Sequence, residues 1–367
     1  MSSPNAIVDL DDAAGLLEAD RLGLLRASAM AGAQVRAVQA AVEEGLLTPV
    51  TDGQRPRSVI WVAGRGAAGA AGEMIAAALG GVTGEPMVTT GSPPWIGPLD
   101  LLVVAGDDPA DPALVSAAAT AVRRGARVVV VAPYEGPLRD ATADRAAVLA
   151  PRLPVPPEFG LCRYLAAGLA AVAAVDPAVR IDLGALADEL DAEALRNSAS
   201  REVFTNPAKA LAVRMTERQV VLAADGAATL GLARHGAAVL LRLAGRPVAA
   251  VGLDDAVAAL GSQPAGGFDD PVAALFHDEQ IDGPRPGRLR VIALALAAER
   301  QLLAARLAGA QGEPIDLLAA EDVGEDVGED VGEAGSAPAA GSPTESQLAT
   351  LAVRLEMAAV YLRLAGG

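Results

Sequence analysis

The segment Gly64-Arg65-Gly66-Ala-Ala-Gly69 is a G-x-G-x-x-G pattern that directly follows an apolar run. Glycines at this spacing let the backbone approach a phosphate, and a helix that starts there offers free N–H groups to the anion. A dinucleotide site also needs an acid at the end of the second strand, but that strand ends in Thr89 and Thr90. The pattern therefore predicts a phosphate-binding turn, and we expect no dinucleotide or other cofactor.

A second turn, Gly106 to Asp111, carries three carboxylates, on Asp107, Asp108 and Asp111. Asp111 precedes Pro112, and this pair is typical of a helix start that is capped by the aspartate. Three carboxylates repel a phosphate unless another group neutralises them. This turn is therefore predicted to cap a helix, and it would bind a phosphate poorly.

Acid–base and metal chemistry have few candidates in this sequence. His277 lies beside Asp278, and such a pair can exchange protons, although a solvated histidine is the alternative. Two histidines and the single Cys162 are too few for a zinc site, so no metal is expected. Neither histidine has the G-x-S-x-G context of a nucleophile elbow. The lone cysteine cannot form an internal disulfide, which indicates a reducing, cytoplasmic setting.

The charge balance argues against a nucleic-acid partner. The 367 residues include 29 basic and 46 acidic side chains, a formal net charge of −17, whereas phosphates must be met by Lys and Arg. The acidic N-terminus does not resemble a secretion signal. The most apolar stretch, Leu165 to Val175, is shorter than the ~18 residues that a membrane span requires. We expect neither a nucleic-acid nor a membrane partner.

The length favours two globular units, and hydrophobicity patterns show how these are built. Apolar runs at Ser58–Ala63 and Leu101–Ala105 predict buried strands, and the helix predicted at Pro112–Arg124 connects the second of these to a further run. A strand, a crossover helix and another strand indicate a parallel sheet with helices on its faces. The pattern returns at Gln219–Ala224 and Leu289–Leu294. The predicted fold class is α/β, with two lobes that are each a parallel sheet between helices.

These elements divide the chain into six parts. They are N-terminal helices (1–50), a first lobe (51–150), helices between the lobes (151–200), a second lobe (201–320), an acidic flexible loop (321–343) and a C-terminal helix (344–367). The loop begins with three tandem Glu-Asp-Val-Gly tetrads, whose short register suits a solvated segment better than a calcium site. A stripe of leucines predicts that the C-terminal helix docks on the fold.

Several local segments occur in an order typical of one family. They are the strand–helix–strand run Leu101–Ala132, Gly136-Pro-Leu138, Cys162-Arg163-Tyr164 and Asn206-Pro-Ala-Lys209. In this layout the chain resembles the two-lobed sugar isomerase (SIS) fold, and most closely the bifunctional phosphoglucose/phosphomannose isomerases. The resemblance implies a sugar phosphate bound between the lobes, a homodimer, a role in carbohydrate metabolism, and aldose–ketose isomerisation by a ring-opening group and a carboxylate base.

The resemblance also implies which residues contact the sugar phosphate. They are Gly64, Arg65, Gly66, Arg163, Asn206 and Lys209. The family's carboxylate base has no counterpart, because the stretch from Arg234-His235-Gly236 to Ala244 contains no acid. We therefore expect a sugar-phosphate-binding protein with degenerate catalytic motifs. One alternative is an active isomerase that uses His277 as acid and Glu202 as base, and another is a non-catalytic regulatory or interaction subunit.

Lys209 is the only lysine of the chain, and it is predicted to lie in the first turn of a helix that begins at Pro207. A positive charge there opposes the helix dipole by about 0.3–1 kcal/mol. A compensating anion is therefore expected close to Lys209, supplied either by a bound ligand or by a structural carboxylate.

Overall fold

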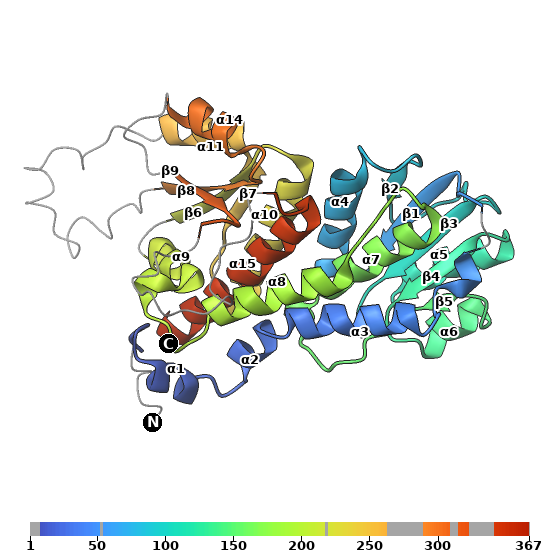
Figure 1. Cartoon of the computed structure of the whole chain (residues 1–367), viewed down its shortest axis with the longest axis horizontal. Helices are drawn as coiled ribbons and strands as arrows, with labels where there is room; N and C mark the ends of the chain where they lie inside the picture. Colours follow the sequence, from blue (N-terminus) through green and yellow to red (C-terminus); the bar gives the residue numbers. More distant parts are fainter. Residues whose placement is uncertain are drawn as a thin grey trace, which may run out of the picture.

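The computed structural model describes residues 8–51, 54–216, 219–262, 289–308, 315–322 and 341–366. The strands in these ranges form two parallel sheets, one in each half of the chain, and helices flank both sheets (Figure 1). This arrangement confirms the predicted α/β class with two lobes that are each built on a parallel sheet. Among the described helices, none is long and apolar enough to cross a membrane.

The first sheet has five strands in the order β2-β1-β3-β4-β5. Strands β1 and β3 are parallel neighbours, with Val59 opposite Leu101. The elements of this lobe are β1 (Ser58–Ala63), α4 (Ala67–Leu79), β2 (Met87–Thr89), β3 (Asp100–Ala105), α5 (Pro112–Arg123), β4 (Arg127–Val131), α6 (Gly136–Thr142) and β5 (Ala147–Val148). As predicted, Asp111 caps α5, because its carboxylate accepts a hydrogen bond of 2.9 Å from the amide of Ala113.

The second sheet has four strands in the order β7-β6-β8-β9. The elements of this lobe are β6 (Gln219–Ala224), α10 (Ala227–Ala244), β7 (Ala249–Gly252), α11 (Leu253–Gly261), β8 (Leu289–Ala295), α14 (Arg300–Leu307) and β9 (Ile315–Ala319). Sequence patterning did not predict β9, an edge strand whose first three residues are only half-buried. Most of the acidic repeat lies outside the described residues.

Further helices and short 3-10 turns join and cover the two lobes. They are α1 (Ala13–Ala19), α2 (Leu24–Ser28), α3 (Ala31–Glu43), η1 (Thr48–Val50), η2 (Pro157–Phe159), α7 (Leu161–Val175), α8 (Leu183–Arg196), η3 (Val203–Thr205), α9 (Pro207–Thr216) and α15 (Thr344–Gly366). The segment predicted to hold N-terminal helices contains α1, α2 and α3. Gly23 separates the first two, since it adopts a left-handed φ of +66° that glycine tolerates, directly before α2.

Helix α15 lies at the centre of the molecule rather than on its surface. It contacts α8, α9 and α10, and every residue from Ser346 to Leu362 is buried (Figure 1). Its charged side chains have partners inside the protein: Arg354 donates hydrogen bonds to Glu193 and to backbone carbonyl oxygens of residues 319, 320 and 322. The leucine stripe therefore predicted the helix, but not that it is buried on all sides.

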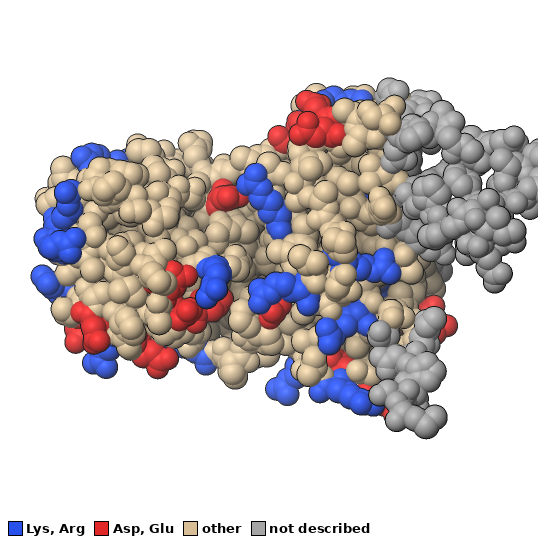
Figure 2. Space-filling view, turned by 180° about the vertical axis from the view of Figure 1, so that it is seen from behind, with Lys and Arg blue, Asp and Glu red and all other residues tan. Residues whose placement is uncertain are grey.

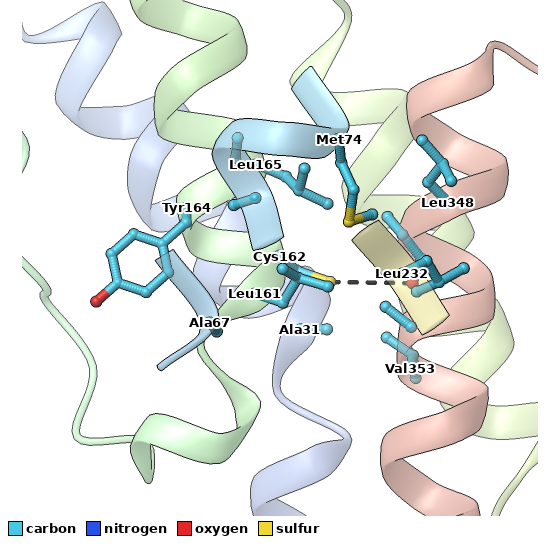
Figure 3. Close-up of a cluster of buried hydrophobic side chains, with 14 of the residues drawn as sticks. Ala31, Ala67, Met74, Leu161, Cys162, Tyr164, Leu165, Leu232, Leu348 and Val353 are labelled. Carbon is cyan, nitrogen blue, oxygen red and sulfur yellow. Dashed lines mark hydrogen bonds between the residues drawn. The ribbon is translucent and has the colours of Figure 1, made fainter. Parts of the chain in front are cut away.

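The largest hydrophobic cluster is shared by both lobes. Figure 3 shows its centre, where Met74 of α4, Cys162 of α7 and Leu232 of α10 lie beside Leu348 of α15. Burial, and then the nearby carboxyl of Glu356, raise the pKa of the Cys162 thiol. Cys162 is therefore a buried, protonated thiol that packs as a small apolar side chain.

Candidate ligand-binding cleft

A cleft of about 780 Å³ lies where the two lobes meet. It is bordered by the turns after β1 and β3 in the first lobe, by η2, and by one face of α10 in the second lobe. Helices α4 and α10 pack against each other along it (Figure 1). Its lining residues are Arg65, Gly66, Ala67, Gly69, Ala70, Glu73, Asp107, Asp108, Asp111, Pro157, Glu158, Arg234, His235, Ala238, Val239 and Arg242. The volume suits a small-molecule ligand.

The two first-lobe turns lie together because β1 and β3 are parallel neighbours, so their carboxyl ends meet at one edge of the sheet. Gly64 and Gly66 allow the close approach. A Cβ at Gly64 would lie 3.5 Å from Cα of Gly106 and 3.3 Å from Asp111 Oδ2. Gly66 has a φ of +93°, which side chains rarely adopt, and no side chain caps the helix that it starts. The amides of the first turn of α4 are therefore available to a ligand.

Charged side chains of both signs line the cleft, and they pair with one another. Each arginine of the lining has an acidic neighbour: Arg242 lies 2.6 Å from Glu158, Arg234 lies 2.8 Å from Glu73, and Arg65 lies 3.9 Å from Asp108. On the face drawn in Figure 2, acidic and basic side chains are likewise interspersed, and neither sign forms a continuous patch. A ligand that enters the cleft therefore meets ion pairs rather than a field of one sign.

Asp107 is held in place from behind the cleft. Its Oδ1 accepts hydrogen bonds from Arg163 Nη2 at 2.9 Å and from the Tyr164 hydroxyl at 2.6 Å. The Arg163 guanidinium also stacks on the Tyr164 ring, 4.1 Å from its centroid. Burial raises the pKa of Tyr164, and the neighbouring Asp107 carboxylate adds to this, so the phenol stays a hydrogen-bond donor. Arg163, predicted as a ligand contact, thus positions a residue of the lining and is not itself part of it.

His235 of the cleft lining forms a buried pair with a carboxylate behind it. His235 Nε2 lies 2.8 Å from Glu356 Oε1, and the side chains are 3% and 1% exposed, respectively. Burial raises the pKa of Glu356, while the hydrogen bond with His235 opposes that rise. The sequence predicted no carboxylate near this part of α10. The structure corrects this, because α15 supplies one from 121 residues further along the chain.

His235, Val239 and Arg242 lie on one face of α10, since they are spaced at i, i+4 and i+7. Seven residues of helix correspond to a rise of about 10 Å. The Arg242 side chain reaches the turn that starts α4: a Cβ placed on Gly66 would lie 4.0 Å from its Nη1. The cleft therefore has a guanidinium next to the start of α4 and an imidazole two helical turns away.

Three other predicted site residues do not line the cleft. Lys209 is fully buried, and its Nζ donates to the carbonyl oxygens of Ala199 at 2.9 Å and Arg201 at 2.7 Å. Asn206 accepts a hydrogen bond from the Lys209 amide at 2.9 Å and so supports the start of α9. Glu202 is exposed at the start of η3. His277 lies outside the described residues. Two carbonyl oxygens satisfy the ammonium directly, and the carboxylates of Asp11 and Asp9 raise its pKa, against the larger effect of burial, so the expected anion is a structural carboxylate.

Sequence reasoning missed the residues that the second lobe and η2 contribute. Arg242 and Glu158 have no motif around them, and Glu73 is one acid in an alanine-rich helix. Glu356 offered one signal, since it is a charged residue within the apolar run Leu355-Glu-Met-Ala-Ala-Val360. Within the described part of the chain, no group of three or more His, Cys, Asp or Glu side chains could hold a metal ion.

No protein-family model and no curated protein matches this chain. Solved structures do match it over nearly its full length. Tagatose-6-phosphate ketose/aldose isomerase from Escherichia coli superposes with a TM-score of 0.59 at 14% identity, covering 100% of this chain and 96% of that one. The C-terminal domain of glucosamine-fructose-6-phosphate aminotransferase from Francisella tularensis gives 0.59 at 11% identity, covering 94% and 95%. These similarities show that the fold is the predicted two-lobed SIS fold.

Proposed function

We propose that the cleft binds a phosphorylated sugar, with the phosphate at the start of α4 between Arg65 and Arg242. The observation that carries the proposal is the approach of Arg242, from the second lobe, to the uncapped start of α4 in the first lobe. Backbone amides at a helix start and a guanidinium are the donors that phosphate monoesters favour. Structural neighbours whose names refer to sugar phosphates support the choice of ligand class.

The ion pairs of the cleft are compatible with such a ligand. Arg65 is 91% exposed at its side chain, and its separation from Asp108 is long, so it can turn towards a phosphate with little loss. The carboxylates of Asp107 and Asp108 face the same space and can accept hydrogen bonds from sugar hydroxyls. Asp107 Oδ2 would lie 4.0 Å from a Cβ placed on Gly66, as close as Arg242 Nη1, so the hydroxyl groups that it binds are those next to the phosphate.

Titration calorimetry with glucose 6-phosphate, fructose 6-phosphate and mannose 6-phosphate tests this proposal. The choice of sugars follows the resemblance to phosphoglucose/phosphomannose isomerases. We expect binding of at least one of them, and no binding of the unphosphorylated sugars. Arg242→Ala should weaken binding about tenfold or more, which corresponds to the loss of one charge-assisted hydrogen bond.

Arg36→Ala is the matched control, because Arg36 pairs with Asp188 and Asp191 and does not line the cleft. It should leave the affinity unchanged. If none of the three phosphates produces heat or raises the melting temperature at millimolar concentration, the proposal is wrong.

Aldose–ketose isomerisation of the bound sugar phosphate is a second candidate function. It is favoured by the presence of proton-exchanging side chains, Glu73 and His235, in the lining of the cleft. Glu202 is not supported as its base, since it does not line the cleft. A coupled assay that follows conversion between the three phosphates tests this candidate; no turnover at high enzyme concentration would exclude it.

A further inference from the structure

The pair His235–Glu356 joins the cleft floor to the buried central helix. We propose that His235 contacts the anionic ligand and that binding of this ligand takes up a proton from solvent at the His235–Glu356 pair. The inference rests on the proposed function, because it concerns a phosphate-bearing ligand in the same cleft. It adds a second recognition element, which responds to pH, to the guanidinium contacts described above.

The geometry leaves one ring nitrogen for a ligand. His235 Nε2 is occupied by Glu356, whereas Nδ1 has no hydrogen bond to any residue that the structure describes. The backbone beneath the ring is tightly packed: a Cβ at Gly236 would lie 3.0 Å from Leu222 Cδ1 and 3.1 Å from Leu355 Cδ1. Helices α10 and α15 therefore pack closely at this point. The hydrogen bond to Glu356 of α15 fixes the orientation of the His235 imidazole in the cleft lining.

The charges around the cleft explain why a proton would be taken up. An incoming phosphate brings negative charge to a space that already holds more carboxylates than arginines, and each of these arginines is paired. Imidazole is the side chain that most readily gains a charge between pH 5 and 8. With Nε2–H donated to the Glu356 carboxylate, protonation at Nδ1 creates a second donor that can point to the ligand, and it removes one negative charge from the pair.

The other charged groups near His235 are already paired in the ligand-free protein. On α10 itself and on α4 and η2, these are Arg234 with Glu73 and Arg242 with Glu158. From α15, Arg354 is bound to Glu193, and from the first lobe Asp107 is bound to Arg163. The nearby Cys162 thiol of α7 has a pKa raised by burial and Glu356, so it stays protonated. Of the strands that pack against α10, β6 and β7 carry no charged side chain, and Arg290 of β8 is paired with Asp316. The pair is thus the group on which the uptake falls.

Calorimetry at pH 7.5 in phosphate-free buffers of different ionisation enthalpy tests the inference. The probes are mannose 6-phosphate, glucose 6-phosphate and glucose 6-sulfate; the sulfate carries no titrating proton of its own. For wild type we expect a buffer-dependent binding heat that corresponds to uptake of a measurable fraction of one proton, with the sulfate as well as with the phosphates. Affinity should rise as the pH is lowered from 8.5 to 6.5.

His235→Gln is the informative variant, because the glutamine amide can still donate to Glu356 but cannot gain a proton. It should fold, bind more weakly at pH 6.5, and lose both the proton uptake and the pH dependence. Binding by wild type with a heat that is independent of the buffer overturns this inference and leaves the proposed function intact. Absence of binding by all three probes removes both. A purely structural role for the pair predicts a lower melting temperature for His235→Gln with unchanged proton uptake.

Discussion

The ammonium of Lys209 donates a hydrogen bond of 2.7 Å to the carbonyl oxygen of Arg201, which lies eight residues earlier in the chain. A second bond of 2.9 Å goes to Ala199, and the Tyr361 ring lies 5.5 Å away. Burial lowers the pKa of Lys209, although the carboxylates of Asp11 and Asp9 oppose this effect. The only lysine of the chain therefore holds the loop at Ala199 and Arg201 against helix α9.

Lys209→Ala should consequently lower the free energy of unfolding of the ligand-free protein. The loss should be about 1–3 kcal/mol, since two partly buried carbonyl oxygens each lose the hydrogen bond from the ammonium. Urea denaturation measures it, and Lys209→Met separates the loss of charge from the loss of the apolar stem. An unchanged stability together with weaker binding of sugar phosphates would return Lys209 to the ligand site.

Glu193→Gln should alter how stability depends on pH. Burial by itself would raise the pKa of Glu193, but Arg354 and Arg196 outweigh burial, and the net shift is downward. An acid with a lowered pKa in the folded state stabilises the protein above its ordinary pKa, and this contribution is lost as the pH falls through the folded value. At pH 7 the variant should lose about 3–5 kcal/mol, because Arg354 is left buried without its counter-charge.

The difference between wild type and Glu193→Gln should narrow progressively below pH 4.5, the ordinary value for glutamate. Urea denaturation at pH 7, 5 and 3.5 gives the free energy of unfolding of wild type and of Glu193→Gln at each pH. The exposed Glu18→Gln serves as the control and should change stability little at each pH. A constant difference between wild type and Glu193→Gln over this range would contradict the argument.

Glycine at position 168 is required by the packing of α7 on the first lobe. A Cβ there would lie 2.8 Å from Trp61 Cζ3 and would overlap Ile75. Gly168→Ala should therefore reduce the free energy of unfolding by about 1–3 kcal/mol. Gly69→Ala is the matched change in α4, where the added methyl would meet only Ala63 Cβ at 4.0 Å. It should be neutral or stabilise the protein by about 0.4–1 kcal/mol, and the same thermal melts compare the two.

Removing the acid that holds Arg242 should strengthen anion binding. Glu158 lies 2.6 Å from Arg242 and competes with a bound phosphate for it. Glu158→Gln should therefore increase the affinity for sugar phosphates several-fold. Glu44→Gln is the comparison, because Glu44 pairs with Arg152 and does not line the cleft. Equal effects of the two changes would mean that only the overall charge matters.

The strands of both sheets were largely predictable because buried parallel strands are short, continuous apolar runs. Strands β1 and β8 begin at the predicted residues, Ser58 and Leu289. Strand β3 begins one residue before the predicted Leu101. A helix start with a strong local signal was also correct, since Asp111 caps α5 as predicted. The edge strand β9 and the complete burial of α15 were not predicted, because they depend on what the rest of the chain covers.

The cleft was predicted only from its first-lobe side. The turn that holds Arg65 and Gly66 has a local motif, so the sequence could place it. His235 and Glu356 have no local motif. They form a pair only because α10 and α15 pack together, and the two residues are 121 positions apart in the chain. Lys209 was misleading as a ligand contact: its hydrogen bonds go to carbonyl oxygens ten and eight residues earlier, and the nearby anions are the carboxylates of Asp11 and Asp9.

The position of α15 has a consequence for synthesis of the protein. All other described elements precede α15 in the chain, yet this helix occupies the middle of the largest hydrophobic cluster. Until residues 344–366 have left the ribosome, the apolar faces of α8, α9 and α10 that contact α15 are not covered. The hydrophobic core that both lobes share is then incomplete. The core therefore closes only after α15 has been made, and until then the growing chain exposes an apolar groove of the kind that chaperones shield.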